Sequence, residues 1–250
     1  MRAARRSLKK PIMKRYYTPS LDRGLLDAEQ SHHCAQVMRQ GVGDLFAVFD
    51  GHGTEAKARI TEIARDQVRF SILAKAASPR PAHPVWLAQA LTKAKSMDMI
   101  IEKATELGVS ELAPLQSDHS VAHVEDEKAD AKVEKWKKLT IEAAKQCGRN
   151  RLMQISEPRP WPEFVVKTPS EAVRLVAHPG GTPIGSIGPA EWISSSAIFL
   201  AVGPEGGFTD EEIGAALAAG WRTVDLGPRI LRTETAAVAM AAIVTAAALR

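Results

Sequence analysis

The stretch of sequence that decides the fold of this protein is residues 197–236, AIFLAVGPEGGFTDEEIGAALAAGWRTVDLGPRILRTETA. It contains two apolar segments, AIFLAV and RTVDL, each of which runs into a glycine-proline turn, with one helical segment between them. Thr209 and Glu212 have the spacing of a capping box, and Gly220 stands where a helix would end on a glycine. The stretch predicts two parallel strands joined by a helix, with both turns at the sheet edge where α/β proteins bind ligands.

These two turns do not match the common nucleotide-binding motifs. A dinucleotide fingerprint needs G-x-G-x-x-G and a phosphate-binding loop needs G-x-x-x-x-G-K-[ST], and neither spacing occurs here. Glu205 lies inside the first turn, where its charge would repel a pyrophosphate. The turns therefore favour a neutral or cationic ligand.

Strands and helices alternate on both sides of this stretch, from about residue 85 to the end of the chain. Apolar strand patterns occur in PVWLAQA, ELAPL, LMQIS and AVRLVA. Helical patterns run from Met97 to Leu107, from about Asp126 to Cys147, and from about Glu234 to Leu249. This alternation predicts a mostly parallel sheet flanked by helices.

The first third of the chain has a different pattern. Residues 13–78 contain short segments of alternating polarity, and the turn at 50–53, Asp-Gly-His-Gly, is a strong hairpin signal. They predict a small antiparallel barrel or sheet, with a short helix at 31–39. Residues 79–84 are rich in proline and predict a linker to a second domain at 85–250.

The composition is that of an ordinary globular protein of 250 residues with a net charge of +4. Residues 1–15 carry seven of the basic residues and no acid, so the basicity resides in a tail at residues 1–12 that is either an RNA-contacting arm or the result of an upstream start codon. No apolar run approaches the roughly 20 residues that a membrane helix needs. Cys34 and Cys147 form neither a disulfide framework nor, with the histidines, a metal-ligand spacing, which favours a cytoplasmic protein without a metal.

The two turn motifs, GPEGGFTDEEI and LGPRILRTETA, resemble those of the ribosomal RNA small subunit methyltransferase E family, of the SPOUT class. Further resemblance lies in IIEKATELGV at 100–109, EAAKQCGRNR at 142–151 and the pair His178-Pro179. It implies a PUA-like barrel followed by an α/β domain with a trefoil knot. It also implies a homodimer that uses S-adenosylmethionine to methylate N3 of a uridine in 16S ribosomal RNA, free or in the small subunit.

The resemblance places the cofactor between the two turns, with Ile230 and Leu231 packing on its adenine. A Cβ at Gly203 or Gly227 would occupy ligand space or require a disfavoured φ. The full set of expected cofactor-binding residues is Ala177, His178, Val202, Gly203, Pro204, Glu205, Gly206, Gly207, Leu226, Gly227, Ile230, Leu231 and Thr235.

Methylation of uracil N3 needs a base to remove its proton and cations near O2 and O4, where the charge spreads. Glu234 is the candidate base, and its alternative role is to cap the helix that it begins or to form an ion pair. Arg232 and Arg149 are the candidates for holding the uracil anion or adjacent phosphates, because the guanidinium group offers a fixed fork of donors.

The last predicted helix, which contains AAVAMAAIVTAAAL, is apolar on all sides. Such a helix is either a central core helix or part of an interface between subunits, and the resemblance favours a homodimer interface. Two other functions stay open. One is methylation of a ribose 2′-oxygen, and the other is RNA binding by a non-catalytic protein that holds S-adenosylmethionine.

Overall fold

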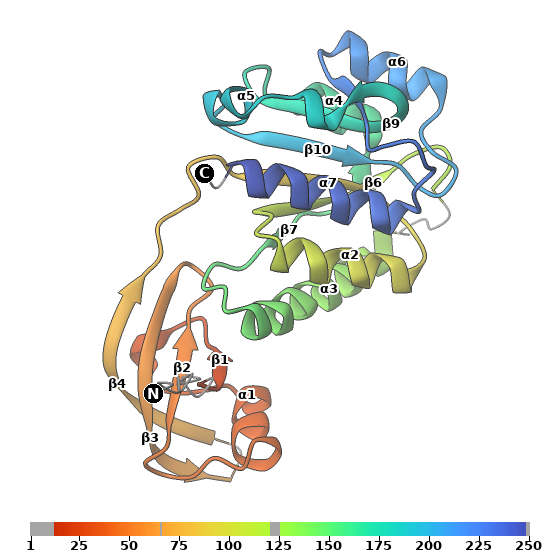
Figure 1. The fold of residues 1–250 in the computed structure, drawn as a ribbon. Coiled ribbons are helices and arrows are strands. Elements are labelled where there is room, and N and C mark those ends of the chain that lie inside the picture. The colour runs from red at the N-terminus through yellow and green to blue at the C-terminus, as the bar shows by residue number, and fades with distance from the viewer. Residues whose placement is uncertain (1–12, 66, 121–125, 249–250) are drawn as a thin grey trace, which may run out of the picture. The chain divides into compact units, whose positions relative to one another are not determined.

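The computed structural model describes residues 13–65, 67–120 and 126–248, so the predicted basic tail at residues 1–12 lies outside the described residues. The chain divides into two compact units between Pro79 and Arg80, and each contains its own sheet (Figure 1). None of the described helices is long and apolar enough to cross a membrane.

The N-terminal unit is a four-stranded sheet in the order β1 (Arg15–Tyr17), β2 (Leu45–Phe49), β3 (Thr54–Ala64) and β4 (Gln67–Ala77). The predicted hairpin joins β2 to β3, and the Asp50 carboxylate accepts hydrogen bonds from the backbone N–H groups of His52 and Thr54, at 2.7 and 3.0 Å. The sheet is not wholly antiparallel as predicted, because β1 pairs with β2 in parallel. The long connection between these two strands permits that crossover.

This connection holds the helical residues of the N-terminal unit. Helix α1 (Ala28–His32) continues as a π-helical turn over His33–Val37, so the helical residues begin three residues before the predicted short helix and end two residues before its predicted end. The core beneath contains Tyr16 and Phe46, whose rings meet edge to face at 5.3 Å. The Tyr16 hydroxyl donates to Gln40 Oε1 at 2.6 Å, so the buried phenol is satisfied.

The second unit has the predicted parallel sheet. Its order is β11 (Arg222–Asp225), β9 (Val173–Pro183), β10 (Ile198–Val202), β5 (Val85–Ala90), β6 (Glu111–Gln116) and β7 (Gln154–Ile155), and a short β8 (Arg159–Pro160) also pairs with β6. Every strand pair in it is parallel. Because β10 lies between β9 and β5, strands from two distant parts of the chain meet at the centre of the sheet.

Helices cover both faces of this sheet (Figure 1). Along β10, Ile198, Leu200 and Val202 point to one face, and Phe199 and Ala201 point to the other. The first face packs against α2 (Ala94–Glu106), α3 (Asp126–Cys147), α5 (Pro189–Ser194) and α7 (Thr233–Ala248). The second packs against α4 (Trp161–Lys167) and α6 (Asp210–Ala218).

Local sequence signals explain the longer helices. In α2 the predicted apolar stripe of Met97, Ile100, Ile101 and Ala104 is buried, and Gly108 follows with a φ of +90°. The capping box of α6 is present in full, with Thr209 and Glu212 each bonding the other's backbone N–H. The short helices α4 and α5 are absent from the prediction, because each is too short to show a hydrophobic period.

Helix α7 is buried on one side only within the single chain, so it is not the central core helix that was one of the two alternatives from its sequence. Met240, Ala241 and Val244 face the sheet and are fully buried, whereas Ile243 is 41% exposed and Ala246 is exposed too. An apolar stripe of this helix therefore lies on the surface of the single chain.

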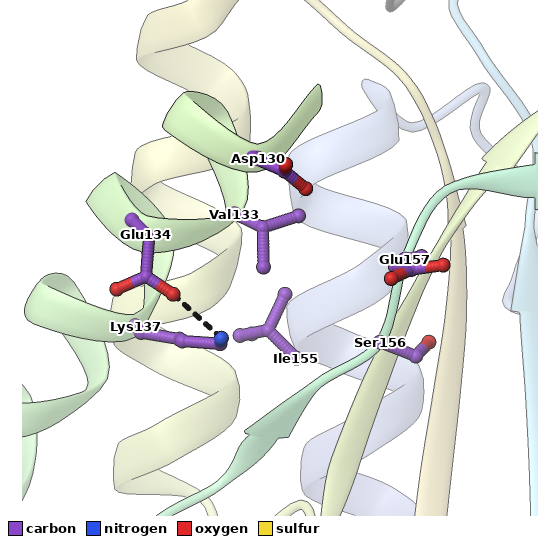
Figure 2. Close-up of a pocket in the computed structure, with 7 residues that line it drawn as sticks. All are labelled: Asp130, Val133, Glu134, Lys137, Ile155, Ser156 and Glu157. Carbon is purple, nitrogen blue, oxygen red and sulfur yellow. Dashed lines mark hydrogen bonds and ion pairs between the residues drawn. The ribbon is translucent and has the colours of Figure 1, made fainter. Parts of the chain in front are cut away.

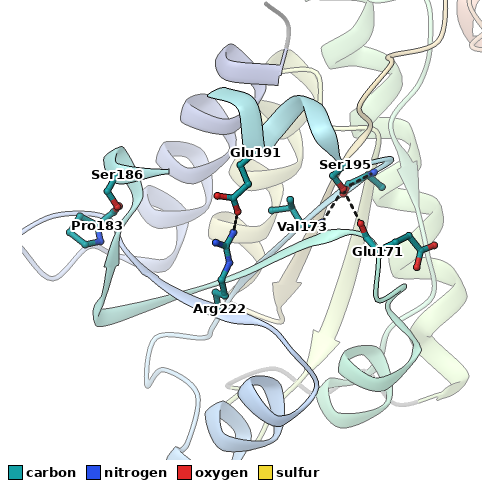
Figure 3. A network of polar contacts seen from close by, with 8 residues as sticks. Glu171, Val173, Pro183, Ser186, Glu191, Ser195 and Arg222 are labelled. Atoms are coloured by element: carbon teal, nitrogen blue, oxygen red, sulfur yellow. Dashed lines mark hydrogen bonds and ion pairs between the residues drawn. The ribbon is translucent and has the colours of Figure 1, made fainter. Parts of the chain in front are cut away.

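A polar network fixes the amino-end edge of the sheet (Figure 3). The Ser195 hydroxyl donates to the carbonyl of Ala197 at 2.6 Å and accepts from the N–H of Val173 at 3.1 Å. Arg222 forms an ion pair with Glu191 of α5. These contacts hold α5 against the starts of β9, β10 and β11.

Candidate active site at the carboxyl edge of the parallel sheet

The two turns of the deciding stretch lie together at the carboxyl-end edge of the sheet, as predicted. The first, at 203–209, follows β10, and the second, at 226–232, leads from β11 into α7. The Thr233 hydroxyl joins them by donating to the carbonyl of Gly203 at 2.7 Å. Sequence segments thirty residues apart are thereby fixed to each other at the place where α/β sheets bind ligands.

The glycine turn after β10 is braced from two directions. A Cβ at Gly203 would lie 3.2 Å from the Phe208 side chain, and one at Gly206 would lie 3.1 Å from that of His119. The ring of His119, in the loop after β6, lies 3.2 Å from the carbonyl oxygens of Gly206 and Gly207. Gly203 has no positive φ, so backbone strain does not require a glycine there, whereas the close approach of Phe208 favours one.

Glu212 links the glycine turn after β10 to the loop after β6. Its carboxylate accepts from the N–H of Thr209 in the capping box at 2.8 Å and from the N–H of Asp118 at 3.1 Å. Its carbonyl accepts from the indole of the buried Trp161 at 3.1 Å. This side chain, which the sequence marks only as a helix cap, therefore also anchors the loop that carries His119.

Strand β9 contributes a third loop to the site. Its pairing with β11 jumps from Val176 to Thr182, so residues 177–181 bulge out of the ladder. The bulge closes at Gly181, where a Cβ would lie 2.7 Å from the backbone of Thr223. Ala177 and His178 are half-buried in this loop, and His178 Nδ1 lies 2.8 Å from the carbonyl oxygen of Pro179.

Asp225 ties the bulge to the second glycine turn. Its carboxylate accepts from the N–H of Gly227 at 2.8 Å and from the N–H of Gly180 at 3.0 Å. The sequence reasoning missed this residue, although an aspartate two positions before a glycine is the pattern of an Asx-turn. The two hydrogen bonds, first that of Gly227 and then that of Gly180, hold the pKa of Asp225 below its usual value.

A lowered pKa in the folded state makes Asp225 stabilising wherever it is ionised. We expect the melting temperature of wild-type protein to exceed that of the Asp225→Asn variant by a constant margin above pH 5. Below about pH 4 this difference in melting temperature should shrink, and it should vanish once the pH is below the lowered pKa of Asp225. Protonation then removes the charge of Asp225 in the wild type as well. Thermal melts of both proteins from pH 3 to 8 measure this, and a margin that persists in acid would contradict it.

The structure places the other expected cofactor residues around these loops, with differing exposure. Val202 and Pro204 are buried, Glu205 is exposed, and Leu226 is half-buried against the core. Leu231 is half-buried, Thr235 is exposed, and Ile230 is 93% exposed. Ile230 therefore has almost its whole side chain free to cover a ligand at the second turn.

Two of the three candidate catalytic residues lie beside these loops. Arg232 is exposed at the end of the second turn, and Glu234 is half-buried at the second position of α7. Within the described part of the chain, neither side chain has a hydrogen-bond or ion-pair partner. Both are therefore available to a ligand, and the structure shows no capping bond from the Glu234 side chain.

Arg149 lies at the other end of the sheet. It lies in the connection between the end of α3 and the start of β7. The first residue of β7 pairs with Glu111, the first residue of β6, so this connection is at the amino-end edge of the sheet. Its guanidinium donates to the carbonyl of Thr105, at the end of α2, at 3.0 Å. Burial lowers the pKa of Arg149 to about 10, which leaves it charged at neutral pH. A single chain does not bring Arg149 together with Arg232 and Glu234.

A separate cavity of about 550 Å³ lies between α3 and the end of β7 (Figure 2). Its lining includes three acidic residues, and its one lysine, Lys137, is ion-paired with Glu134 at 2.7 Å. The lining residues are Asp130, Val133, Glu134, Lys137, Ile155, Ser156 and Glu157. The cavity contains none of the expected site residues, and its charge disfavours an RNA phosphate.

Comparison with known proteins bears on both units. Residues 78–245 match the model of an RNA methyltransferase domain, and residues 26–73 match that of an RNA methyltransferase PUA domain. The chain is 32% identical over 217 residues to ribosomal RNA small subunit methyltransferase E of Bacillus subtilis, which covers 84% of this chain and 85% of that protein.

Solved structures agree with these matches. Ribosomal RNA small subunit methyltransferase E of Neisseria gonorrhoeae, bound to S-adenosyl methionine, has a TM-score of 0.85 and 30% identity over 94% of this chain and 97% of its own. A putative methyltransferase of Legionella pneumophila, in complex with the same cofactor, has a TM-score of 0.85 and 31% identity over 94% and 98% of the two chains. The family resemblance and the predicted PUA-like and α/β fold are thereby confirmed, and this chain belongs to the RNA methyltransferase family, with the ribosomal RNA small subunit methyltransferase E proteins among its relatives.

Proposed function

We propose that this protein transfers a methyl group from S-adenosylmethionine to N3 of a uridine in 16S ribosomal RNA. The observation that carries the proposal is the pair of glycine turns at the carboxyl edge of the sheet, with Arg232 and Glu234 directly beside the second turn. The relatives named for small subunit ribosomal RNA and the neighbours with bound S-adenosylmethionine support the RNA class and the cofactor. We place the reaction in the cytoplasm, where ribosomal RNA is assembled.

The backbone of the two turns fits a ligand that approaches closely. Gly207 and Gly227 have φ values of +74° and +127°. No heavy atom of the described residues beyond the adjacent chain lies within 4 Å of a Cβ built at either glycine. Open space thus faces bare backbone at both turns, where amide and carbonyl groups can bind adenine and Ile230 can cover it.

Gly227→Val tests this assignment. We expect the variant to lower the affinity for S-adenosylmethionine at least tenfold, because a side chain at this φ is strained by about 1 to 3 kcal/mol and also enters the ligand space. Calorimetry on folded protein measures the affinity. Gly214→Ala, in an exposed and unobstructed position of α6, is the control and should leave the affinity unchanged. Equal affinities in all three proteins would place the cofactor elsewhere.

The side chains beside the turns supply what methylation of uracil requires. The bound cofactor provides an electrophilic methyl group on a sulfonium. Glu234 accepts the proton from uracil N3, and Arg232 stabilises the negative charge that then spreads over O2 and O4. By stabilising the uracil anion, Arg232 also lowers the free energy needed to move the N3 proton to the Glu234 carboxylate.

We also propose that the N-terminal unit, over residues 13–78, binds the RNA, with residues 79–84 as its linker to the methyltransferase domain at 85–250. The match to a PUA domain of RNA methyltransferases supports this. Arg149 contacts the RNA from the amino-end edge of its own sheet, or reaches the uracil only in a partner subunit. The substrate is the 16S RNA itself or the small subunit that contains it.

The exposed stripe of α7 supports a homodimer. Ile243 and Ala246 are exposed on a helix whose remaining faces are also apolar, and such a surface is costly in water. A second copy of the chain would cover it, and the trefoil knot implied by the resemblance would hold this helix in place. The knot and the dimer belong to the proposal.

Ile243→Glu should convert the protein to monomers and remove most of its activity. A buried carboxylate at an apolar interface costs several kcal/mol, while the same residue remains solvated in the monomer. Light scattering at fixed concentration measures the mass. Val166→Glu is the matched control, since Val166 is 77% exposed on α4, across the sheet. Met240 is unsuitable as a probe, because it is buried in the chain's own core. A stable, active monomer of wild-type protein would refute the dimer.

The target atom is tested by mass spectrometry of nucleosides from 16S RNA of a strain that lacks the protein. We expect 3-methyluridine to be missing and to return on complementation. Loss of a 2′-O-methyl nucleoside would instead show ribose methylation. RNA binding by purified protein without transfer of tritium from labelled cofactor would show a non-catalytic binding protein.

A further inference from the structure

Gln89 is a polar side chain in the middle of the parallel sheet. It lies in β5 beside Val202 of β10, and it is fully buried. Because side chains alternate along a strand, Gln89 points to the same face as Leu87, which α2 and α7 cover. It thus lies under the start of α7, where Thr233 begins the helix.

A relay of hydrogen bonds leads from Gln89 to the cofactor turn. Gln89 Nε2 donates to the Thr233 hydroxyl at 3.1 Å and to the carbonyl of Ala90 at 2.9 Å. The Thr233 hydroxyl donates its hydrogen to the carbonyl of Gly203 at 2.7 Å, so it must accept from Gln89. These directions fix the orientation of the carboxamide, since a flipped oxygen would face the carbonyl of Ala90.

The same carboxamide is poorly suited to a purely structural role. Its Oε1 is buried and has no hydrogen-bond partner among the described residues. A buried acceptor without a donor destabilises the folded state, and an apolar side chain of similar size would avoid that cost. The amide group is therefore explained better by what Nε2 holds in place than by its contribution to stability.

We propose that Gln89 is a positioning residue. Through the Thr233 hydroxyl it holds the glycine turn at 203–209 at a fixed position relative to Arg232 and Glu234. Thr233 stands between Arg232 and Glu234, so the bond to Gly203 fixes the distance from both residues to the turn. Small displacements of aligned reactants cost large factors in rate. The inference rests on the proposed methyl transfer, and neither Gln89 nor Thr233 need touch the RNA.

The test combines Gln89→Leu, Thr233→Val, Thr233→Ser and the double variant of the first two. We expect Gln89→Leu and Thr233→Val each to lower the single-turnover rate at saturating cofactor and RNA by about tenfold or more. The double variant should be no worse than the poorer single one, because both remove the same relay. Thr233→Ser keeps the hydroxyl and should remain within about threefold of wild type.

Thr245→Val is the control for loss of a buried threonine hydroxyl. Thr245 lies in the same helix, is 5% exposed and donates to the carbonyl of Ala241 at 2.7 Å, outside the relay. Its rate should be that of wild type. The proposal would be overturned by normal rates in Gln89→Leu and Thr233→Val. It would also be overturned if the two losses multiplied in the double variant, or if Thr245→Val lost as much rate as they do. Should Gln89→Leu not fold, equal rates for Thr233→Val and Thr233→Ser would overturn it.

Cofactor affinity separates this inference from the function on which it rests. Calorimetry should show that Gln89→Leu and Thr233→Val each weaken the affinity for S-adenosylmethionine about threefold or more. The double variant should bind no more weakly than the weaker of these two, and Thr233→Ser should bind as the wild type does. If wild-type protein methylates no uridine, the proposed target fails, while this pattern of affinities still supports the relay. Unchanged affinities together with normal rates refute the relay and leave the function intact.

Discussion

Arg232→Ala should lower the single-turnover rate of methyl transfer by about a hundredfold or more, with little change in cofactor affinity. Arg232 is exposed beside the second glycine turn and has no ion-pair partner within the described residues, so its charge is available to the uracil oxygens. Removal of one preorganised donor to a developing anion typically costs about 3 to 4 kcal/mol. Rapid-quench measurements with labelled cofactor at saturating RNA give the rate directly.

Arg229→Ala separates catalysis from general attraction to RNA. Arg229 is exposed in the same turn, and its loss should weaken RNA binding and lower the slope of log K against log salt by about 0.7 to 0.9, as for any phosphate contact. Its single-turnover rate at saturating RNA should stay normal. Equal rates for the two variants would show that Arg232 only attracts the RNA backbone.

Glu234→Gln should also reduce the single-turnover rate about a hundredfold or more, and it should change the pH profile. The amide keeps the shape and the hydrogen bonding of the side chain but cannot accept the N3 proton, and a positioned base typically contributes 10² to 10⁴-fold. If the base is lost, the remaining rate should rise with pH as the uracil ionises by itself. Rates measured from pH 6 to 9 test both statements.

Glu211→Gln is the matched control for this substitution. Glu211 is the second residue of α6, as Glu234 is the second residue of α7, and it is exposed. Both changes remove a carboxylate from the first turn of a helix, so both lose the same favourable interaction with the helix dipole. A near-normal rate with an unchanged pH profile in Glu234→Gln would show that Glu234 is structural and that solvent removes the proton.

Local signals in the sequence predict most elements of the methyltransferase unit. The capping box of Thr209 and Glu212, the stripe of α2 and the apolar run of β10 each depend on residues within a few positions of one another. Such patterns encode hydrogen bonds and burial that form within one helix or strand. The proximity of the two glycine turns was also predictable, because parallel strands end at a common edge.

Contacts between distant segments were not predictable in this way. The bulge at residues 177–181 depends on Gly181 meeting the backbone of Thr223, and the bond from Asp225 to Gly180 spans 45 residues. The parallel pairing of β1 with β2 depends on the path of the intervening chain. None of these contacts produces a periodic pattern in the sequence, since each joins two single residues or strands that are far apart along the chain.

The sequence by itself determined the succession of the longer strands and helices along the chain, the two glycine turns and the family resemblance, because these reside in short patterns of polarity, capping and glycine. Tertiary structure alone decided which of the candidate catalytic side chains lie at the carboxyl edge of the sheet. It places Arg232 and Glu234 at the carboxyl edge and Arg149 at the opposite one, and it leaves Ile243 on the surface while burying Met240. Strand order sets these distances, and strand order is the outcome of packing over the whole unit.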